Sequence, residues 1–300
     1  MKPALRKAIP EPESSFIVRK DIGTKMKNNW HYHPDFELLF IKRSMGTWLV
    51  GDYVGPFKSG DIILLGPNLP HSFRHDYSYI MERDKQPGEA IVVLFPKELF
   101  GKGFLELPET KEIGTMLALS GKGLKLATQT KIKVAGIMSS MLEENPSKRF
   151  FDLLQILQLI AEKKQYQKLV SEGFSYKSDG IDNARLSAIF EYTFNNYQNQ
   201  ITIDELAALI NVGKHTFCRF FKEKTNKTYL QFLMEIRIGK ACKCLIEDNM
   251  NISEVGYSCG YNSLSHFNHQ FRTIKNMSPL EYKHQYDHLS SELKAPLSRK

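Results

Sequence analysis

The stretch TIDELAALINVGKHTFCRFFKEK, residues 202–224, reads as a short helix, a tight turn and a second amphipathic helix. Thr202 followed three residues later by Glu205 forms a capping box, which marks a helix start. Asn211-Val212-Gly213 is a short turn that contains glycine, as a helix-turn-helix unit requires. Phenylalanines recur at helical spacing after Lys214 and give the second helix one apolar face. The stretch therefore predicts two helices that cross closely, the second exposing its other face.

That exposed face is polar and basic. With Phe217, Phe220 and Phe221 turned inward, the residues left outside are Lys214, His215, Cys218, Arg219 and Lys222. A helix lying in the major groove of DNA needs hydrogen-bond donors and positive charge on such a face. We therefore expect these five residues to contact DNA.

A second unit of the same kind follows in NISEVGYSCGYNSLSHFNHQFRTI, residues 251–274. Its second helix is expected to bury Phe267, Phe271 and Ile274 and to expose Ser265, Asn268, His269 and Arg272. Ser, Asn and His can hydrogen-bond base edges, whereas arginine at the last position suits a phosphate. A long helix over residues 229–247 separates the units. If it holds them about one DNA turn apart, roughly 34 Å, both enter the same face of a duplex.

Several spaced motifs in this region resemble the AraC/XylS family of bacterial transcription regulators. They are IRIGKA at 236–241, ISEVG at 252–256, GYNSLSHF at 260–267, FR at 271–272 and MSPLEY at 277–282. The resemblance covers residues 183–286 and implies a double helix-turn-helix domain. It puts the base-reading positions on His215, Cys218, Arg219, Leu264, Ser265, Asn268 and His269. Gly213 departs from the usual serine cap, and Leu264 stands where a polar residue is frequent.

The N-terminal part has a different texture. Short apolar runs at residues 36–41, 47–50, 61–65 and 90–95 are bounded by Gly, Pro or Asn and predict β-strands. Their spacing favours an all-β barrel or sandwich. Between residues 108 and 169 apolar residues recur at helical spacing, and these stripes either pack on the barrel or pair between two copies. The expected fold class is thus α+β and multidomain.

His31-x-His33-x-x-x-Glu37, Gly60-Asp61 and Pro70-His71 together resemble the two motifs of the cupin barrel. In metal-binding cupins the matching residues would be metal ligands: His31, His33, Glu37 and His71. Lys25, Gly66, Asn68 and His75 depart from the enzyme pattern, and regulators of the AraC type generally use this barrel to sense small molecules. We therefore expect no cofactor or metal, and an effector pocket formed by His31, His33, Glu37, Trp48 and His71.

These elements predict six segments. They are a disordered N-terminus (1–15), a cupin-like barrel (16–107), a helical dimerisation region (108–171), a linker (172–182), the DNA-binding domain (183–288) and a flexible tail (289–300). The expected partners are double-stranded promoter or operator DNA, a small polar effector such as a sugar, and a second copy of the chain.

Composition is consistent with this reading. The formal net charge is +8, and residues 211–243 alone hold eight Lys or Arg against two Glu, so positive charge concentrates at the first unit. The four cysteines, Cys218, Cys242, Cys244 and Cys259, form no Cys-x-x-Cys pair, which argues against structural zinc. No secretory signal or membrane span is apparent, and a cytoplasmic protein is expected.

Two other classes remain open. A cupin metalloenzyme with an accessory DNA-binding domain would bind one metal ion and turn over a substrate. An architectural DNA-binding protein without an effector would show little sequence preference. We expect a regulator and no enzyme activity.

Overall fold

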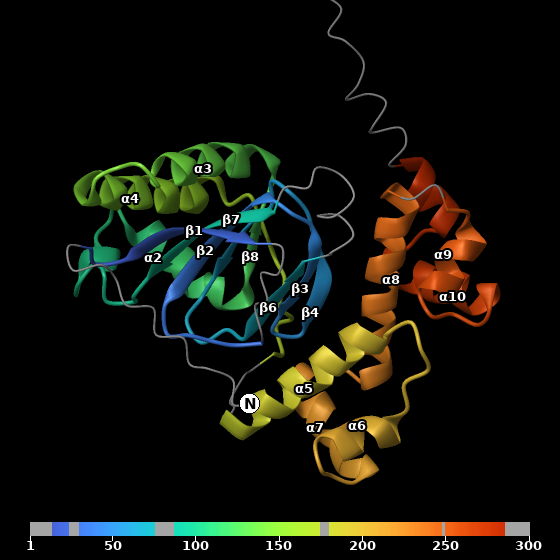
Figure 1. Ribbon diagram of the computed structural model, residues 1–300. Helices are drawn as coiled ribbons and strands as arrows, with labels where there is room; N and C mark the ends of the chain where they lie inside the picture. The colour runs from blue at the N-terminus through green and yellow to red at the C-terminus, as the bar shows by residue number, and fades with distance from the viewer. Residues whose placement is uncertain (1–13, 24–29, 76–86, 175–179, 248–249, 286–300) are drawn as a thin grey trace, which may run out of the picture. The chain divides into compact units, whose positions relative to one another are not determined.

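The computed structural model describes residues 14–23, 30–75, 87–174, 180–247 and 250–285, and the chain divides into two compact units, Met1–Ser187 and Ala188–Lys300 (Figure 1). The expected tail at 289–300, all but the last two residues of the expected disordered N-terminus, Lys25 and residues 175–179 of the expected linker lie outside the described residues.

Two antiparallel sheets form the N-terminal unit. The six-stranded sheet has the order β1-β7-β2-β5-β8-β9 and the three-stranded sheet the order β4-β3-β6. The bounds are β1 Ile17–Gly23, β2 Phe36–Arg43, β3 Gly46–Val50, β4 Tyr53–Phe57, β5 Ile62–Leu65, β6 His71–His75, β7 Gly88–Phe95, β8 Leu124–Leu126 and β9 Tyr166–Lys168. The four apolar runs of the sequence became β2, β3, β5 and β7.

The larger sheet is buried on both faces. Leu38 and Leu64 pack toward the helices, whereas their neighbours Leu39 and Leu65 pack toward the smaller sheet. Because successive side chains of a strand point to opposite faces, a doubly covered strand is apolar throughout, which explains the unbroken apolar runs. Glu37 shares the face of Leu39, so the alternation directs this carboxylate into the space between the sheets.

Helices cover the outer face of the larger sheet: α2 Lys111–Leu119, α3 Thr128–Ser140 and α4 Pro146–Lys163, with α3 and α4 lying over the strands in Figure 1. Two 3-10 turns, Phe104–Glu106 and Ser120–Lys122, flank α2. Val134, Met138, Leu153 and Leu157 are fully buried in one core with the sheet. The apolar stripes of this region thus pack on the strands of their own chain.

The expected closed barrel is not what the described strands form, since no ladder among them joins the two sheets. Strand β4 is an edge strand and contains Pro56, whose nitrogen cannot donate to a further neighbour. An isolated bridge between His31 and His71 links the segment before β2 to the smaller sheet. The sequence predicted β2, β3, β5 and β7 correctly, but the closed barrel that it favoured is not formed by the described strands.

The C-terminal helices are α5 Gly180–Asn196, α6 Ile203–Leu209, α7 Lys214–Thr225, α8 Tyr229–Glu247, α9 Ile252–Ser258 and α10 Leu264–Lys275. The first half of α8 packs its Tyr229 and Phe232 against Phe221 of α7. Its second half joins α9 and α10 in another core, with Leu245 and Phe267 buried. One continuous helix therefore belongs to both helix-turn-helix units. None of the described helices combines the length and apolar character that crossing a bilayer requires.

Candidate functional site

The first helix-turn-helix unit starts with the predicted capping box. Thr202 Oγ1 accepts from the Glu205 amide at 3.2 Å, and Glu205 Oε2 accepts from the Thr202 amide at 2.8 Å. Asn211 takes a left-handed conformation in the turn, with φ of 54°. Asparagine tolerates this region better than other non-glycine residues. Helix α7 then begins at Lys214, as the sequence predicts.

Helix α7 separates its faces cleanly. Phe217 and Phe221 are fully buried and Phe220 is half-buried. All five residues predicted to contact DNA are exposed: Lys214, His215, Cys218, Arg219 and Lys222. Lys214 Nζ lies 3.0 Å from Asp204 Oδ2, and both side chains are exposed, so water screens this pair. The outer face is therefore open and basic.

Helix α10 repeats this plan fifty residues later. Both helices have twelve residues, both end at an asparagine with φ of 56°, and buried Phe267 and Phe271 match Phe217 and Phe221. Its exposed residues include all four predicted contacts, Ser265, Asn268, His269 and Arg272, whereas Leu264 is half-buried. Two helices with the same inner face thus present two different outer faces.

A separate group of side chains meets inside the N-terminal unit. Glu37 comes from β2 of the larger sheet, His71 from β6 of the smaller sheet, and His31 and His33 from the segment before β2. Paired backbone hydrogen bonds of 3.0 and 2.9 Å join His31 to His71 and hold the two rings side by side. These four residues, here called the histidine cluster, offer ligand atoms that lie within 4.8 Å of one another.

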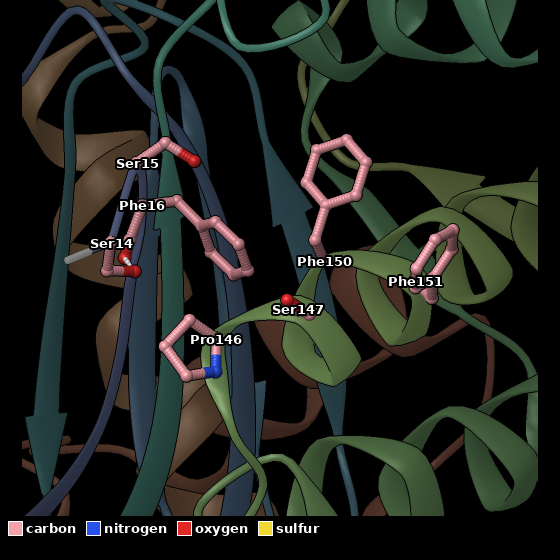
Figure 2. A pocket seen from close by; sticks show the side chains of 7 residues that line it. All are labelled: Ser14, Ser15, Phe16, Pro146, Ser147, Phe150 and Phe151. Atoms are coloured by element: carbon pink, nitrogen blue, oxygen red, sulfur yellow. Dashed lines mark hydrogen bonds between the residues drawn. The ribbon is translucent and has the colours of Figure 1, made fainter.

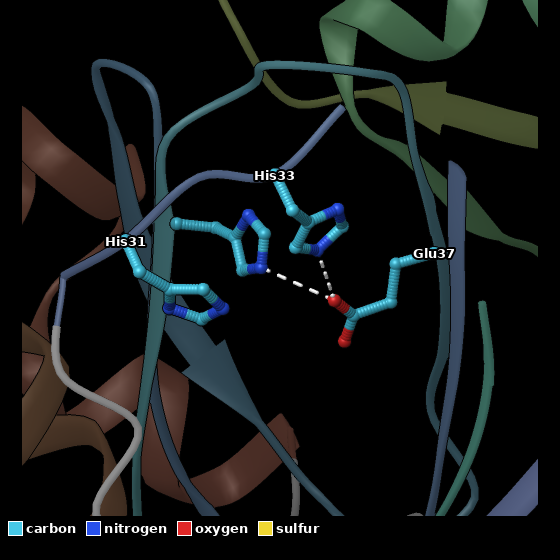
Figure 3. Close-up of side chains that lie close together, drawn as sticks. His31, His33 and Glu37 are labelled. Atoms are coloured by element: carbon cyan, nitrogen blue, oxygen red, sulfur yellow. Dashed lines mark hydrogen bonds and ion pairs between the residues drawn. The ribbon is translucent and has the colours of Figure 1, made fainter. Parts of the chain in front are cut away.

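The histidine cluster converges on one carboxylate oxygen. Glu37 Oε2 lies 2.8 Å from His33 Nε2 and 3.2 Å from His71 Nε2. Figure 3 shows the His33 ring joined by a dashed line to a Glu37 carboxylate oxygen, with the His31 ring farther from that oxygen. Burial alone would raise the pKa of Glu37, but its hydrogen bonds to the two imidazoles outweigh burial and hold that pKa well below its ordinary value. Burial opposes charge on His33 as well, yet Glu37 leaves the pKa of His33 raised.

Trp48, the fifth residue predicted for the effector pocket, lies outside the histidine cluster. It is fully buried between the sheets, where its ring packs on Phe57 at 5.6 Å. Its indole Nε1 is buried and has no hydrogen-bond partner among the described residues. The structure thus brings together four of the five predicted residues and leaves Trp48 outside that group, on the strand β3 that pairs with β6.

Comparison with known proteins adds to this geometry. A protein-family profile described as a helix-turn-helix domain matches residues 206–285. The HTH-type transcriptional activator RhaS of Pectobacterium atrosepticum is 21% identical over 257 residues, covering 85% of this chain and 87% of that protein. These matches show an AraC-type helix-turn-helix domain at the C-terminus of a transcription regulator.

Other relatives match this AraC-type regulator over shorter stretches. The uncharacterized HTH-type regulator YdeC of Bacillus subtilis is 33% identical over 121 residues, which is 39% of this chain and 42% of YdeC. The DNA-binding domain of AdpA, solved with a target DNA, is 25% identical and covers 36% of this chain and 96% of that structure. The TM-score of that match is 0.34.

Sequence reasoning missed the contact that joins the regulator's two helix-turn-helix units. Arg237 on α8 donates from Nε to the Tyr197 carbonyl at 2.8 Å, and from its terminal nitrogen to the Asn199 carbonyl at 2.9 Å. A Cβ on Gly260, where φ is 87°, would lie 2.6 Å from the same Tyr197 oxygen. The turn of the second unit therefore packs against the loop before α6. In the sequence, the glycine at position 260 is the one signal that could have indicated this contact.

Proposed function

We propose that α7 and α10 read one operator together, each in its own major groove. The repeated helix pair carries the proposal, because two outward polar faces on matching frameworks suit two successive grooves. Arg219, Ser265, Asn268 and His269 are assigned to base edges, and Lys222 and Arg272 to phosphates. His215, Cys218 and Lys214 complete the contact surface.

A salt titration on a selected operator and on a random duplex tests this assignment. Phosphate contacts set the slope of affinity against salt, and base contacts set the gap between the two duplexes. We expect a gap of about 10³-fold or more at physiological salt. Equal affinity for both duplexes would favour an architectural protein instead.

In the same proposal, a small polar ligand bound in the N-terminal unit controls DNA binding. Support comes from polar groups buried between the sheets, namely the histidine cluster and the unpartnered Nε1 of Trp48. A buried donor without a partner costs free energy that a ligand oxygen would recover. The ligand must bind one arrangement of the chain more tightly than another in order to shift operator affinity.

A panel of sugars and other small polar metabolites, each assayed for operator affinity and thermal stabilisation, tests for control by an organic effector. An effector should stabilise the N-terminal unit and change operator affinity in the same samples. Turnover of any candidate would favour the rival metalloenzyme. Because its partner is chromosomal DNA, we expect the protein in the cytoplasm, which cell fractionation would test.

We also propose that the chain forms a homodimer, through exposed residues on α3 and α4. The helical stripes first considered for pairing are buried against the sheet, so another surface is needed. Ile132 on α3 and Phe151 on α4 are 66% and 65% exposed. Beside Phe151 lies a pocket of about 290 Å³ between the segment before β1 and the start of α4, lined also by Phe16, Pro146 and Phe150 (Figure 2).

Light scattering of the purified chain measures this association. Phe151→Asp should shift the protein from dimer to monomer, because a buried charge without a partner opposes pairing. Ile22→Asp, on an apolar residue that is 54% exposed on β1, serves as the control and should leave the dimer intact. A monomeric wild-type chain would end the proposal.

A further inference from the structure

Arg237 lies where the two helix-turn-helix units meet. It belongs to the middle of α8, the helix that both units share. The half of α8 before it packs on α7 of the first unit, and the half after it, including Ile238 and Leu245, lies in the core of the second. A residue in this position can affect how one unit is held against the other.

Helix α8 alone is a weak spacer at this point. Gly239 follows Arg237 by two residues, and a Cβ there would meet no described atom outside its own stretch of helix within 4 Å. Packing therefore does not require glycine here, and glycine is the weakest helix former after proline. Contacts beside the helix must then help to hold its two halves in one arrangement.

Arg237 makes such contacts on the side of the first unit. Its guanidinium donates to two carbonyls of the loop before α6, that of Tyr197 at 2.8 Å and that of Asn199 at 2.9 Å. Donors that point in fixed directions from one planar group define an orientation as well as a distance. Burial lowers the pKa of Arg237 from its ordinary value. This cation is thus partly removed from water, where its hydrogen bonds are stronger than at an exposed site.

The same guanidinium faces the second unit. Its Cζ lies 5.6 Å from the centroid of the Tyr261 ring, within the range of a cation–π interaction. The buried Tyr261 donates from its hydroxyl to Gln270 Oε1 on α10 at 2.8 Å. Its ring also packs on Phe267 of α10, with the ring centroids 5.2 Å apart. Arg237 thus connects the loop before α6 to α10 through one intervening side chain.

We propose that Arg237 fixes the spacing between the two DNA segments that α7 and α10 contact. It acts as a positioning residue and touches no base itself. The inference rests on the proposed function, because it requires both helices to bind one operator.

The physical basis is the geometry of the duplex. One base pair added between the segments moves the second by about 3.4 Å along the duplex and turns it by about 34° around the axis. Helices held in one arrangement lose contacts at the displaced segment, whereas loosely joined helices can follow it.

The test uses the full chain and three duplexes. They are the selected operator, the same operator with one base pair inserted between its segments, and a duplex that keeps only the segment bound by α7. The wild type should bind the inserted duplex about tenfold or more weakly than the operator, because contacts with base pairs are lost. In Arg237→Gln this ratio should shrink at least about threefold. Affinity for the single-segment duplex should not change, because the outer face of α7 is intact.

Arg237→Lys separates positioning from a phosphate contact. Lysine keeps the charge but lacks the planar fork that reaches two carbonyls, so the ratio should shrink as in Arg237→Gln. If Arg237 bound a phosphate instead, lysine would restore the wild-type ratio and glutamine would lower the salt slope on all three duplexes. That result would overturn the inference. The lysine variant also decides the question if the glutamine variant does not fold.

Lys227→Gln is the matched control. Lys227 Nζ lies 2.9 and 2.7 Å from the two carboxylate oxygens of Glu235, so this variant also removes a partly buried cation beside α8. It leaves the Arg237 contacts in place and should keep the wild-type ratio. An equal change in Lys227→Gln would contradict a special role of Arg237.

Circular dichroism establishes which variants are folded. Folded Arg237 variants with the wild-type ratio would overturn the inference and leave reading by two helices intact. A wild type that binds the operator and the inserted duplex equally would overturn the proposed function together with the inference. The two failures are therefore distinguishable.

Discussion

In the first helix-turn-helix unit the outer face of α7 carries Lys214, Arg219 and Lys222, whereas the matching face of α10 carries one cation, Arg272. The inner faces hardly differ, because each buries a pair of phenylalanines at the same two positions. Such a difference indicates that packing fixes both frameworks while DNA recognition varies on top of them. On the proposed assignment, the first unit offers more charge to phosphates and the second more neutral groups to base edges.

Substitutions in the turns of the two units should have the largest effect and test the comparison most strongly. Gly260→Ala forces a side chain into a left-handed conformation and against the Tyr197 and Gln198 carbonyls at 2.6 and 2.8 Å. Strain and overpacking together should cost about 2–5 kcal/mol. Asn211→Ala, at the equivalent turn position, meets the conformational strain alone and should cost about 1 kcal/mol.

Urea unfolding followed by helical circular dichroism measures both turn variants. Both tryptophans, Trp30 and Trp48, lie in the N-terminal unit, so their fluorescence reports that unit separately and should not change. If both variants lose the same free energy of unfolding, the contact with the Tyr197 carbonyl contributes nothing to stability.

Base reading is the next largest effect. Arg219→Ala should lower operator affinity by about 1–3 kcal/mol and relax preference at one or two base pairs. His269→Ala, at the matching position of α10, should relax preference at different base pairs. Binding to a set of operators with single base changes gives both profiles. An equal loss on every sequence would instead identify Arg219 as a phosphate contact.

Phosphate contacts should give smaller, sequence-independent effects. Lys222→Ala and Arg272→Ala occupy matching positions, and each should reduce the salt slope of binding by about 1. Titrations between low and physiological salt measure that slope on operator and random DNA alike. A change confined to the operator would contradict the assignment.

The smallest effect concerns the helix caps. Gly213 makes no side-chain cap, whereas Ser263 accepts from the His266 amide at 3.5 Å. No atom of the described residues lies within 4 Å of a Cβ on Gly213, so Gly213→Ser should stabilise α7 by a few tenths of a kcal/mol. The reverse change, Ser263→Gly, should cost a similar amount. Loss of stability in both variants would show that the N-caps of α7 and α10 are not equivalent.

The helix-turn-helix units were predictable because their signals are local. Capping at Thr202, the turn at Asn211 and the phenylalanine spacing gave the start of α7 to the residue. The short strands β8 and β9 were missed, since three residues such as Leu124–Leu126 become a strand only by pairing with β5. β4 and β6 were missed for a related reason, because Gly, Pro and His interrupt any apolar period.

The four residues of the histidine cluster could be predicted from the sequence, but their burial and hydrogen bonding could not. The spacing of His31, His33 and Glu37, with the motif around His71, named the four residues. Their burial, the carbonyls behind two of the rings and the shared carboxylate depend on how the two sheets pack. Sequence reasoning had no access to these facts.

Selection of preferred sites from random DNA by the wild-type chain, by Arg219→Ala and by Asn268→Ala tests the central claim most directly. The wild type should select two conserved segments about 10 base pairs apart, centre to centre. Arg219→Ala should lose preference in one segment and Asn268→Ala in the other. A single conserved segment, or two variants that relax the same one, would contradict reading by both helices.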